Sequence, residues 1–308
     1  MNFDLTDDQV AIRDGIRSLC EGRFPMKRVR DGFDRATWDE LAEAGVFSFH
    51  DDGLGWADAA IVFEELGRAL VPGPLAWGVV VHGVVDGIVA GIERPRDADA
   101  AMIEYPDLID GLVVLDGAEA TRVAPDALDR EALDWPLDPL VPLARVRSLP
   151  AGEALADVDV TAWRRHGALL TAAYAVGIAS VLTEISTAYA KERVQFDRPI
   201  GSFQAVKHLL ADMLVRAEMA RVAVHAAAVA LDDPEIGGVD RALSGAKVLA
   251  GEAALLNGKT ATQVHGGMGF TWEVDVHLYL KRAWLLDTQF GSVDHHADAV
   301  VTEVERGT

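Results

Sequence analysis

The chain has 308 residues, of which 50% are apolar and 25% are charged, so it has enough apolar side chains for a large core and is not a disordered chain. Its formal net charge of −21 disfavours nucleic acid and anionic membranes as partners, because both would repel such a surface. The single cysteine, Cys20, excludes an internal disulfide framework. Together with an acidic N-terminal segment that lacks the apolar core of a signal peptide, it predicts a cytoplasmic protein.

The first 94 residues predict a small helical domain. Thr6 opens a capping box with Gln9, and apolar residues then follow at helical spacing. Three further helices are predicted in residues 38–47, 56–70 and 75–90. The last of them is too short for a membrane span and contains His82 and Asp86, so we expect a buried helix.

Residues 95–160 predict a shortened β domain. Short apolar runs at 111–115 and 143–149 are typical of strands. Prolines exclude long helices from this segment. They are Pro95, Pro106, Pro125, Pro136, Pro139, Pro142 and Pro150.

Residues 161–308 predict an antiparallel bundle of four long helices, because apolar residues recur there every three or four positions over long runs. The last helix, within residues 277–305, is expected to break at Gly291. This part carries 14 basic and 17 acidic side chains, which leaves 14 basic and 32 acidic side chains in residues 1–160. A ligand with phosphate groups should therefore find its cations in the bundle.

Two loops between the predicted bundle helices carry candidate chemistry. An arginine can hold a diphosphate through paired hydrogen bonds, and an aromatic ring can pack against a flat ligand. The first loop spans residues 191–208 and carries both basic and aromatic side chains. They are Lys191, Arg193, Phe196, Arg198, Phe203 and Lys207. An ordinary charged loop between two helices is the alternative.

The second loop has the sequence QVHGGMGFTWE and spans residues 263–273. Its glycines, at positions 266, 267 and 269, can adopt positive φ and let another molecule approach the backbone. The alternative is a helix C-cap followed by a tight turn.

Together the two loops match one family in order and spacing. The segment ERVQFDRPIGSFQAVKH resembles the flavin-contacting loop of acyl-CoA dehydrogenases, and QVHGGMGFTWEVDVHLYLKRA resembles their second flavin-contacting loop and the helix after it. Near the start, LTDDQVAIRDGIRSLCEGRFP, WDELAEAGVF and FEELGRAL resemble the N-terminal helical domain of the family. The resemblance implies a mainly α, acyl-CoA dehydrogenase-like fold with an N-terminal helical domain (1–94), a reduced middle β segment (95–160) and a C-terminal four-helix bundle (161–308).

The resemblance also implies a chemistry. Members of the family remove an α-proton from an acyl-CoA thioester with a carboxylate, while N5 of FAD takes the β-hydride. Arg193 matches the arginine that reaches the FAD pyrophosphate of a neighbouring subunit. The other residues implied to bind FAD are Phe196, Gln204, Gln263, Gly266 and Gly267.

The catalytic carboxylate of the family has no counterpart in this chain. Its usual Y-E-G-T stretch corresponds to residues 289–292, which places Phe290 at the position of the base. Some members carry the base on the first bundle helix instead, and that position falls on Gly167. Asp294 is a weak candidate for a displaced base.

One further feature of the family is missing. The middle segment has no match to the family motif resembling T-E-P-x-A-G-S-D, which covers the flavin ring.

No metal site is predicted. His295 and His296 are neighbours on a helix, so their side chains point in different directions.

These retentions and losses favour a non-catalytic subunit of a heteromeric α2β2 acyl-CoA dehydrogenase, which completes the FAD site of a catalytic partner subunit. The resemblance extends to such enzymes of steroid-degrading bacteria, which implies a steroid side-chain CoA thioester as substrate and electron-transfer flavoprotein or a similar protein as electron acceptor. Two alternatives stay open. The chain is a self-sufficient dehydrogenase with Asp294 as base, or a flavin-free structural protein of the same fold.

Overall fold

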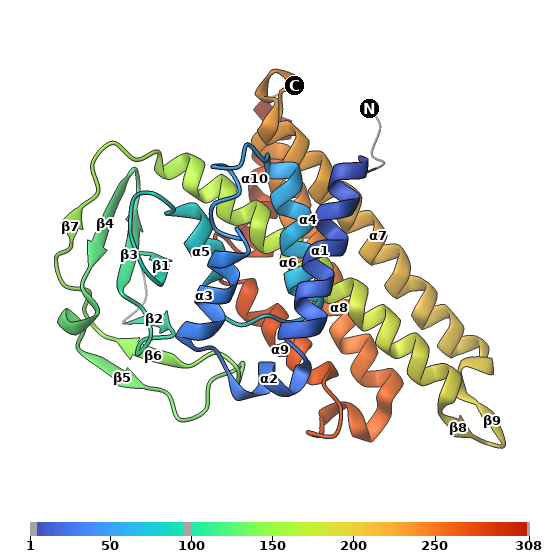
Figure 1. The fold of residues 1–308 in the computed structure, drawn as a ribbon. Coiled ribbons are helices and arrows are strands. Elements are labelled where there is room, and N and C mark those ends of the chain that lie inside the picture. Colours follow the sequence, from blue (N-terminus) through green and yellow to red (C-terminus); the bar gives the residue numbers. More distant parts are fainter. Residues whose placement is uncertain (1–4, 95–99, 307–308) are drawn as a thin grey trace. The chain divides into compact units, whose positions relative to one another are not determined.

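The computed structural model describes residues 5–94 and 100–306, and these divide into two compact units (Figure 1). Unit 1 comprises residues 1–26, 55–71 and 168–308, and unit 2 comprises residues 27–54 and 72–167. Pro95 and the first four residues of the N-terminal segment, on which two of the expectations above rest, lie outside the described residues. The three domain ranges given above stay a prediction.

Unit 1 begins with α1 (Asp7–Arg23), whose start is fixed by the predicted capping box. The Thr6 hydroxyl accepts from the Gln9 amide, and the Gln9 side chain accepts from the Thr6 amide. This helix packs against α4 (Trp56–Arg68). The Asp232 carboxylate caps α4, because it accepts from the backbone amides of Trp56 and Ala57 at 2.7 and 2.9 Å.

The predicted bundle makes up the rest of unit 1. Its helices are α6 (Val160–Glu192, which enters unit 1 at Ala168), α7 (Gln204–Asp232), α8 (Val239–His265), α9 (Val276–Leu286) and α10 (Val293–Arg306). The α8 helix packs against α7, α9 and α10. The last helix is interrupted as predicted, and Gly291 lies in the break with φ +93°.

Buried polar contacts fix the register of the bundle. The side-chain amide of Asn257, on α8, donates to the carbonyls of Ala179 and Met213, each at 3.0 Å. These carbonyls belong to α6 and α7, so one fully buried side chain joins three helices.

By length and composition α6 could cross a membrane, but 83% of its most apolar window is buried inside the protein. The burial explains its composition as that of a core helix.

Pro234–Ile236 forms a 3-10 turn (η3) between α7 and α8.

Among its described residues, unit 2 contains three short helices, the first turns of α6 and two small sheets. The helices are α2 (Met26–Asp31, beginning at the unit boundary), α3 (Arg35–Glu43) and α5 (Leu75–Val80). One sheet has the order β1-β3-β4-β7, with β1 and β3 parallel and the other pairs antiparallel. The other sheet is antiparallel with the order β2-β6-β5.

The strands confirm a small β segment, although β1 lies before its predicted start at residue 95. They are β1 (Val89–Glu93), β2 (Ala101–Glu104), β3 (Gly111–Asp116), β4 (Glu119–Val123), β5 (Arg130–Ala132), β6 (Leu143–Val146) and β7 (Glu153–Ala154). In residues 100–159 the described helical structure is one 3-10 turn, η1 (Pro125–Ala127), as the prolines predict.

The predicted helix over residues 75–90 is wrong in its second half. Helix α5 ends at Val80, and Val89 already pairs with Gly111 in the sheet. Gly83 and Gly87 adopt φ of +74° and +90°, a conformation that a continuing helix cannot contain. A short apolar run suits a buried strand as well as a buried helix, which explains the error.

Candidate functional site

The first predicted FAD loop is a β-hairpin at the junction of α6 and α7, and Figure 1 shows it at the end of both helices. Its strands are β8 (Val194–Gln195) and β9 (Arg198–Pro199), and a 3-10 turn, η2 (Ile200–Ser202), leads into α7. Phe196 and Asp197 form the two-residue turn with φ of +54° and +63°. The Phe196 ring is 86% exposed at the tip.

Arg193 stands at the base of this hairpin with an exposed side chain. Its backbone is fixed at both ends, because its amide donates to the Tyr189 carbonyl and its carbonyl accepts from the Ile200 amide, both at 2.8 Å. Within residues 5–94 and 100–306 its guanidinium has no ion pair or hydrogen bond. In a chain of net charge −21, an arginine without a carboxylate partner is available to an external anion.

The second predicted loop begins where α8 ends. Gly266 has φ +62° and is the first residue of a 3-10 turn, η4 (Gly266–Phe270). A Cβ atom built on Gly266 or Gly267 meets no atom within 4 Å, so the space beside this backbone is open to a ligand. Gly269 differs, since its Cβ would lie 2.5 Å from the Thr262 carbonyl and glycine is needed there for packing.

Gln204 and Gln263 occupy corresponding places next to these loops. Gln204 is the first residue of α7 and Gln263 lies in the last turn of α8, and both are exposed. The structure also brings the end of α6 against the second loop, because Tyr189 contacts His265 and Met268. Two sequence-distant segments, residues 189–204 and 263–270, thus meet at one end of the bundle.

The residues that the resemblance places at the base positions, Phe290 and Gly167, stay a prediction, and the structure locates them as follows. Phe290 is buried between α9 and α10 with φ +51°, and its carbonyl accepts from His296 Nε2 at 2.9 Å. Asp294 is exposed in the first turn of α10. Gly167 lies in the part of α6 that belongs to unit 2, whereas Phe290 and Asp294 belong to unit 1.

Lys247 is a buried residue that the sequence argument missed. It lies on α8, is 4% exposed, and burial lowers the pKa of its ammonium to about 8. The Nζ atom donates to Thr171 Oγ1 at 2.9 Å and to the carbonyls of Leu286 and Gln289 at 3.2 and 2.9 Å. Lys247 therefore holds the turn that carries Phe290.

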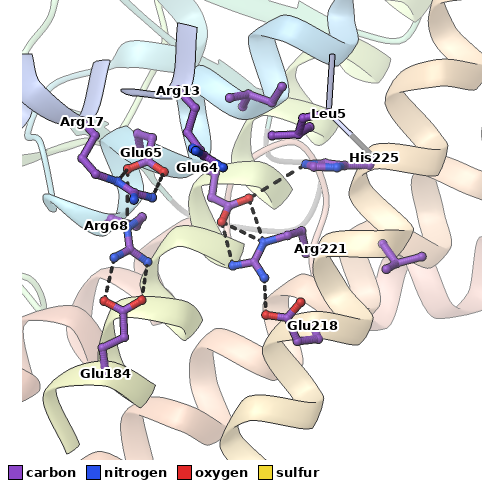
Figure 2. Close-up of a pocket in the computed structure, with 12 residues that line it drawn as sticks. Leu5, Arg13, Arg17, Glu64, Glu65, Arg68, Glu184, Glu218, Arg221 and His225 are labelled. Atoms are coloured by element: carbon purple, nitrogen blue, oxygen red, sulfur yellow. Dashed lines mark hydrogen bonds and ion pairs between the residues drawn. The ribbon is translucent and has the colours of Figure 1, made fainter. Parts of the chain in front are cut away.

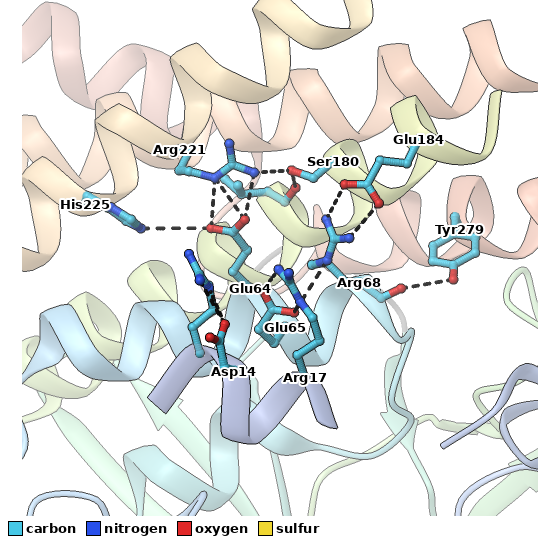
Figure 3. A network of polar contacts seen from close by, with 12 residues as sticks. Asp14, Arg17, Glu64, Glu65, Arg68, Ser180, Glu184, Arg221, His225 and Tyr279 are labelled. Atoms are coloured by element: carbon cyan, nitrogen blue, oxygen red, sulfur yellow. Dashed lines mark hydrogen bonds and ion pairs between the residues drawn. The ribbon is translucent and has the colours of Figure 1, made fainter. Parts of the chain in front are cut away.

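A charged pocket of about 470 Å³ lies elsewhere in unit 1 (Figure 2). Its arginines are engaged by carboxylates, as Figure 3 shows: Arg17 by Glu65, Arg68 by Glu184, and Arg221 by Glu64. Burial opposes the charge of Arg221, but Glu64 and Glu218 raise its pKa overall. These guanidinium groups are already satisfied, so this network joins α1, α4, α6 and α7 and does not offer an anion site.

No group of three or more His, Cys, Asp or Glu side chains that could hold a metal is found among the described residues. His296 is committed elsewhere, since its Nδ1 contacts Ser244 Oγ at 3.1 Å while its Nε2 bonds Phe290. Burial lowers the pKa of His296 and favours the neutral ring.

The fold and the two loops are those expected of an acyl-CoA dehydrogenase-like protein, and comparison with known proteins agrees. Residues 161–304 match the model of the acyl-CoA dehydrogenase C-terminal domain, and residues 6–91 match that of the N-terminal domain. The chain is 33% identical to acyl-CoA dehydrogenase IpdE2 of Mycolicibacterium smegmatis, over 91% of this chain and 93% of the relative. This protein belongs to the acyl-CoA dehydrogenase family, whose chemistry is the FAD-dependent dehydrogenation of acyl-CoA thioesters.

A second relative is much longer than this chain. Acyl-CoA dehydrogenase FadE34 of Mycobacterium tuberculosis is 34% identical over 91% of this chain, but this chain spans only 45% of its length. The resemblance to the family that the two loops predict is confirmed. The FAD roles of Arg193, Phe196, Gln204, Gln263, Gly266 and Gly267 stay a prediction.

Solved structures with low identity share the fold. The ChsE4-ChsE5 complex from Mycobacterium tuberculosis has a chain with a TM-score of 0.82 at 21% identity, covering 99% of both chains. Butyryl-CoA dehydrogenase from Megasphaera elsdenii has a TM-score of 0.81 at 19% identity, covering 99% of this chain and all of the other. The predicted acyl-CoA dehydrogenase-like fold, with its helix bundle and small β segment, is confirmed.

Proposed function

We propose that this chain is the non-catalytic subunit of a heteromeric acyl-CoA dehydrogenase and completes the FAD site of a catalytic partner subunit. The proposal rests on a surface that offers groups to bind an anion and on the lack of a recognised catalytic carboxylate. Arg193 has no protein partner among the described residues, and the backbone at Gly266 and Gly267 is open, while the family resemblance aligns Phe290 with the catalytic carboxylate.

The residues at the bundle end fit the diphosphate of a flavin dinucleotide. Arg193 supplies a guanidinium fork, and the amides beside Gly266 and Gly267 lie on backbone that a ligand can approach. Gln204 and Gln263 add exposed amide groups next to these. When bound, FAD supplies the hydride acceptor; the contribution of this chain is to hold its anionic part.

The substrate and partners follow from the relatives. One solved neighbour is described as a steroid acyl-CoA dehydrogenase and another as a two-protein complex. We assign an α2β2 assembly, a steroid side-chain CoA thioester as substrate, and electron-transfer flavoprotein or a similar protein as electron acceptor. The cytoplasmic location expected from the single cysteine is part of the same proposal.

Co-expression with a candidate catalytic partner, a full-length acyl-CoA dehydrogenase from the same organism, tests the proposal. We expect the purified complex to be yellow and to oxidise a steroid side-chain CoA, and the lone chain to do neither. A lone chain that holds FAD and reduces an acceptor would support the alternative in which Asp294 acts as base. A complex without flavin would favour the structural role.

Arg193→Ala tests the site itself. Loss of the guanidinium should weaken FAD retention by the complex about tenfold or more, because a charge-assisted contact to a phosphate is removed. Arg147→Ala is the matched control, since its side chain is 75% exposed in unit 2. Equal flavin content in both variants would contradict the assignment of the loop.

A further inference from the structure

An aromatic stack joins the ends of α6 and α8, the helices that lead into the two loops of the candidate site. The rings of Tyr189 and His265 lie 4.2 Å apart with an interplanar angle of 21°. Tyr189 precedes Arg193 by one helical turn on α6, and His265 is the last residue of α8, directly before Gly266. The Tyr189 hydroxyl also reaches Met268 Sδ in the second loop at 4.0 Å.

The His265 ring is held by its own helix, and the backbone of Tyr189 is bonded to Arg193. His265 is 5% exposed, and its Nδ1 donates to the Ala261 carbonyl at 2.8 Å, which fixes the tautomer. Burial lowers the pKa of His265, although the bond to Ala261 opposes this, so the stacked ring is neutral at pH 7. Tyr189 is tied to Arg193, because its carbonyl accepts the Arg193 amide.

The hairpin that carries Arg193 depends on such an anchor. All residues from Lys191 to Pro199 are exposed. The described anchor on its far side is Gly201, whose Cβ would lie 2.8 Å from the Ala190 carbonyl, so the chain passes close to the end of α6 there. The stack and the Tyr189–Met268 contact are described contacts between the helix turn that precedes this hairpin and the glycine loop.

We propose that Tyr189 and His265 are positioning residues, which set the separation of Arg193 from the Gly266–Gly267 backbone so that both bind one diphosphate. The inference rests on the proposed function, since it gives the site a fixed geometry for FAD. Neither ring is required to touch the cofactor. The stack acts through Arg193 on one side and through the start of η4 on the other.

The test compares variants that keep or remove the stack in the co-expressed complex. Tyr189→Phe keeps the ring and should retain FAD as the wild type does. Tyr189→Leu and His265→Ser remove the stack and should weaken FAD retention about fivefold. The free energy of one aromatic pair corresponds to a change of about that size in a binding constant. Flavin absorbance per complex across a salt series measures this effect.

A double-mutant cycle separates positioning from general packing. If the stack acts through Arg193, Tyr189→Leu should have little further effect in an Arg193→Ala background. Additive losses would overturn the inference, as would full FAD retention by both Tyr189→Leu and His265→Ser. A wild-type complex that retains no more FAD than Arg193→Ala would instead contradict the proposed function.

Hydrogen exchange on the lone chain supplies a readout that needs neither partner nor FAD. His265→Ser lies on α8, yet it should speed exchange of the Arg193 and Ile200 amides, which are hydrogen-bonded in the hairpin. Unchanged exchange at these two amides would overturn the coupling of the loops. This arm also decides the matter if Tyr189→Leu fails to fold.

Discussion

Lys247 is a cation enclosed in the helix bundle, and its protonation is coupled to folding. Its pKa is about 8 in the folded protein and 10.5 in an unfolded chain. Between these pH values the unfolded state binds more protons, so the contribution of Lys247 to stability rises with pH across this window. Below pH 8 both states are protonated and the contribution is constant.

We therefore expect the free energy of unfolding of the wild type, relative to Lys247→Met, to increase by about 3 kcal/mol from pH 8 to pH 10.5. Urea unfolding of both proteins across this range measures the difference, in which titrations of other groups cancel. Lys259→Met, on the exposed side of α8, is the control and should track the wild type. A pH-independent difference between wild type and Lys247→Met would refute the prediction.

Arg193 and Lys247 mark the limits of prediction at the scale of residues. Arg193 could be found because its neighbours in the sequence form a recognisable motif. Lys247 could not, because the groups it bonds to come from α6 and from the segment around α9, far along the chain. The Tyr189–His265 stack was missed for the same reason, since neither ring has a signal of its own.

At the scale of elements, α4 and α6 cross at two glycines. A Cβ on Gly67 would lie 2.1 Å from the Tyr174 carbonyl, and a Cβ on Gly177 would lie 2.0 Å from the Glu64 carbonyl. Both obstacles are backbone atoms, which cannot move without moving a helix. The contact also lets the Tyr174 hydroxyl reach the Val71 carbonyl at 2.9 Å.

Gly177→Ala should therefore destabilise the protein by about 2 kcal/mol or more, even though alanine favours a helix. Gly245→Ala is the matched control, since its Cβ meets nothing within 4 Å on α8. We expect that control to gain about 0.5–1 kcal/mol. Thermal unfolding of the two variants measures both effects, and a stabilised Gly177→Ala would disprove the close crossing.

The helices were predictable from local signals, whereas the strand β1 was not. Capping at Thr6 and the long apolar repeats of the bundle each depend on residues within one element. The strand β1 depends on its partner, because Val89 to Glu93 become a strand by pairing with β3 across intervening residues. Such pairing leaves no periodic signal in five residues.

At the scale of the whole molecule, charge is unevenly distributed along the chain. Residues 1–160 carry 14 basic and 32 acidic side chains, whereas the nearly balanced residues 161–308 carry the hairpin and the glycine loop. The same part exposes apolar side chains on α7. Val215, Met219 and Val222 follow the i, i+4, i+7 spacing of one helix face and are each more than half exposed.

Under the proposed function, this face of α7 is covered by the catalytic partner subunit, because α7 starts directly at the hairpin that contacts its FAD. Met219→Glu should weaken assembly at least about tenfold, since a carboxylate would be buried there without a partner. Met102→Glu, on β2 of unit 2 and 46% exposed, is the control and should assemble normally. Size-exclusion chromatography of the co-expressed pair measures the outcome; a Met219→Glu complex that persists on dilution, as the control does, would show that the partner binds another face.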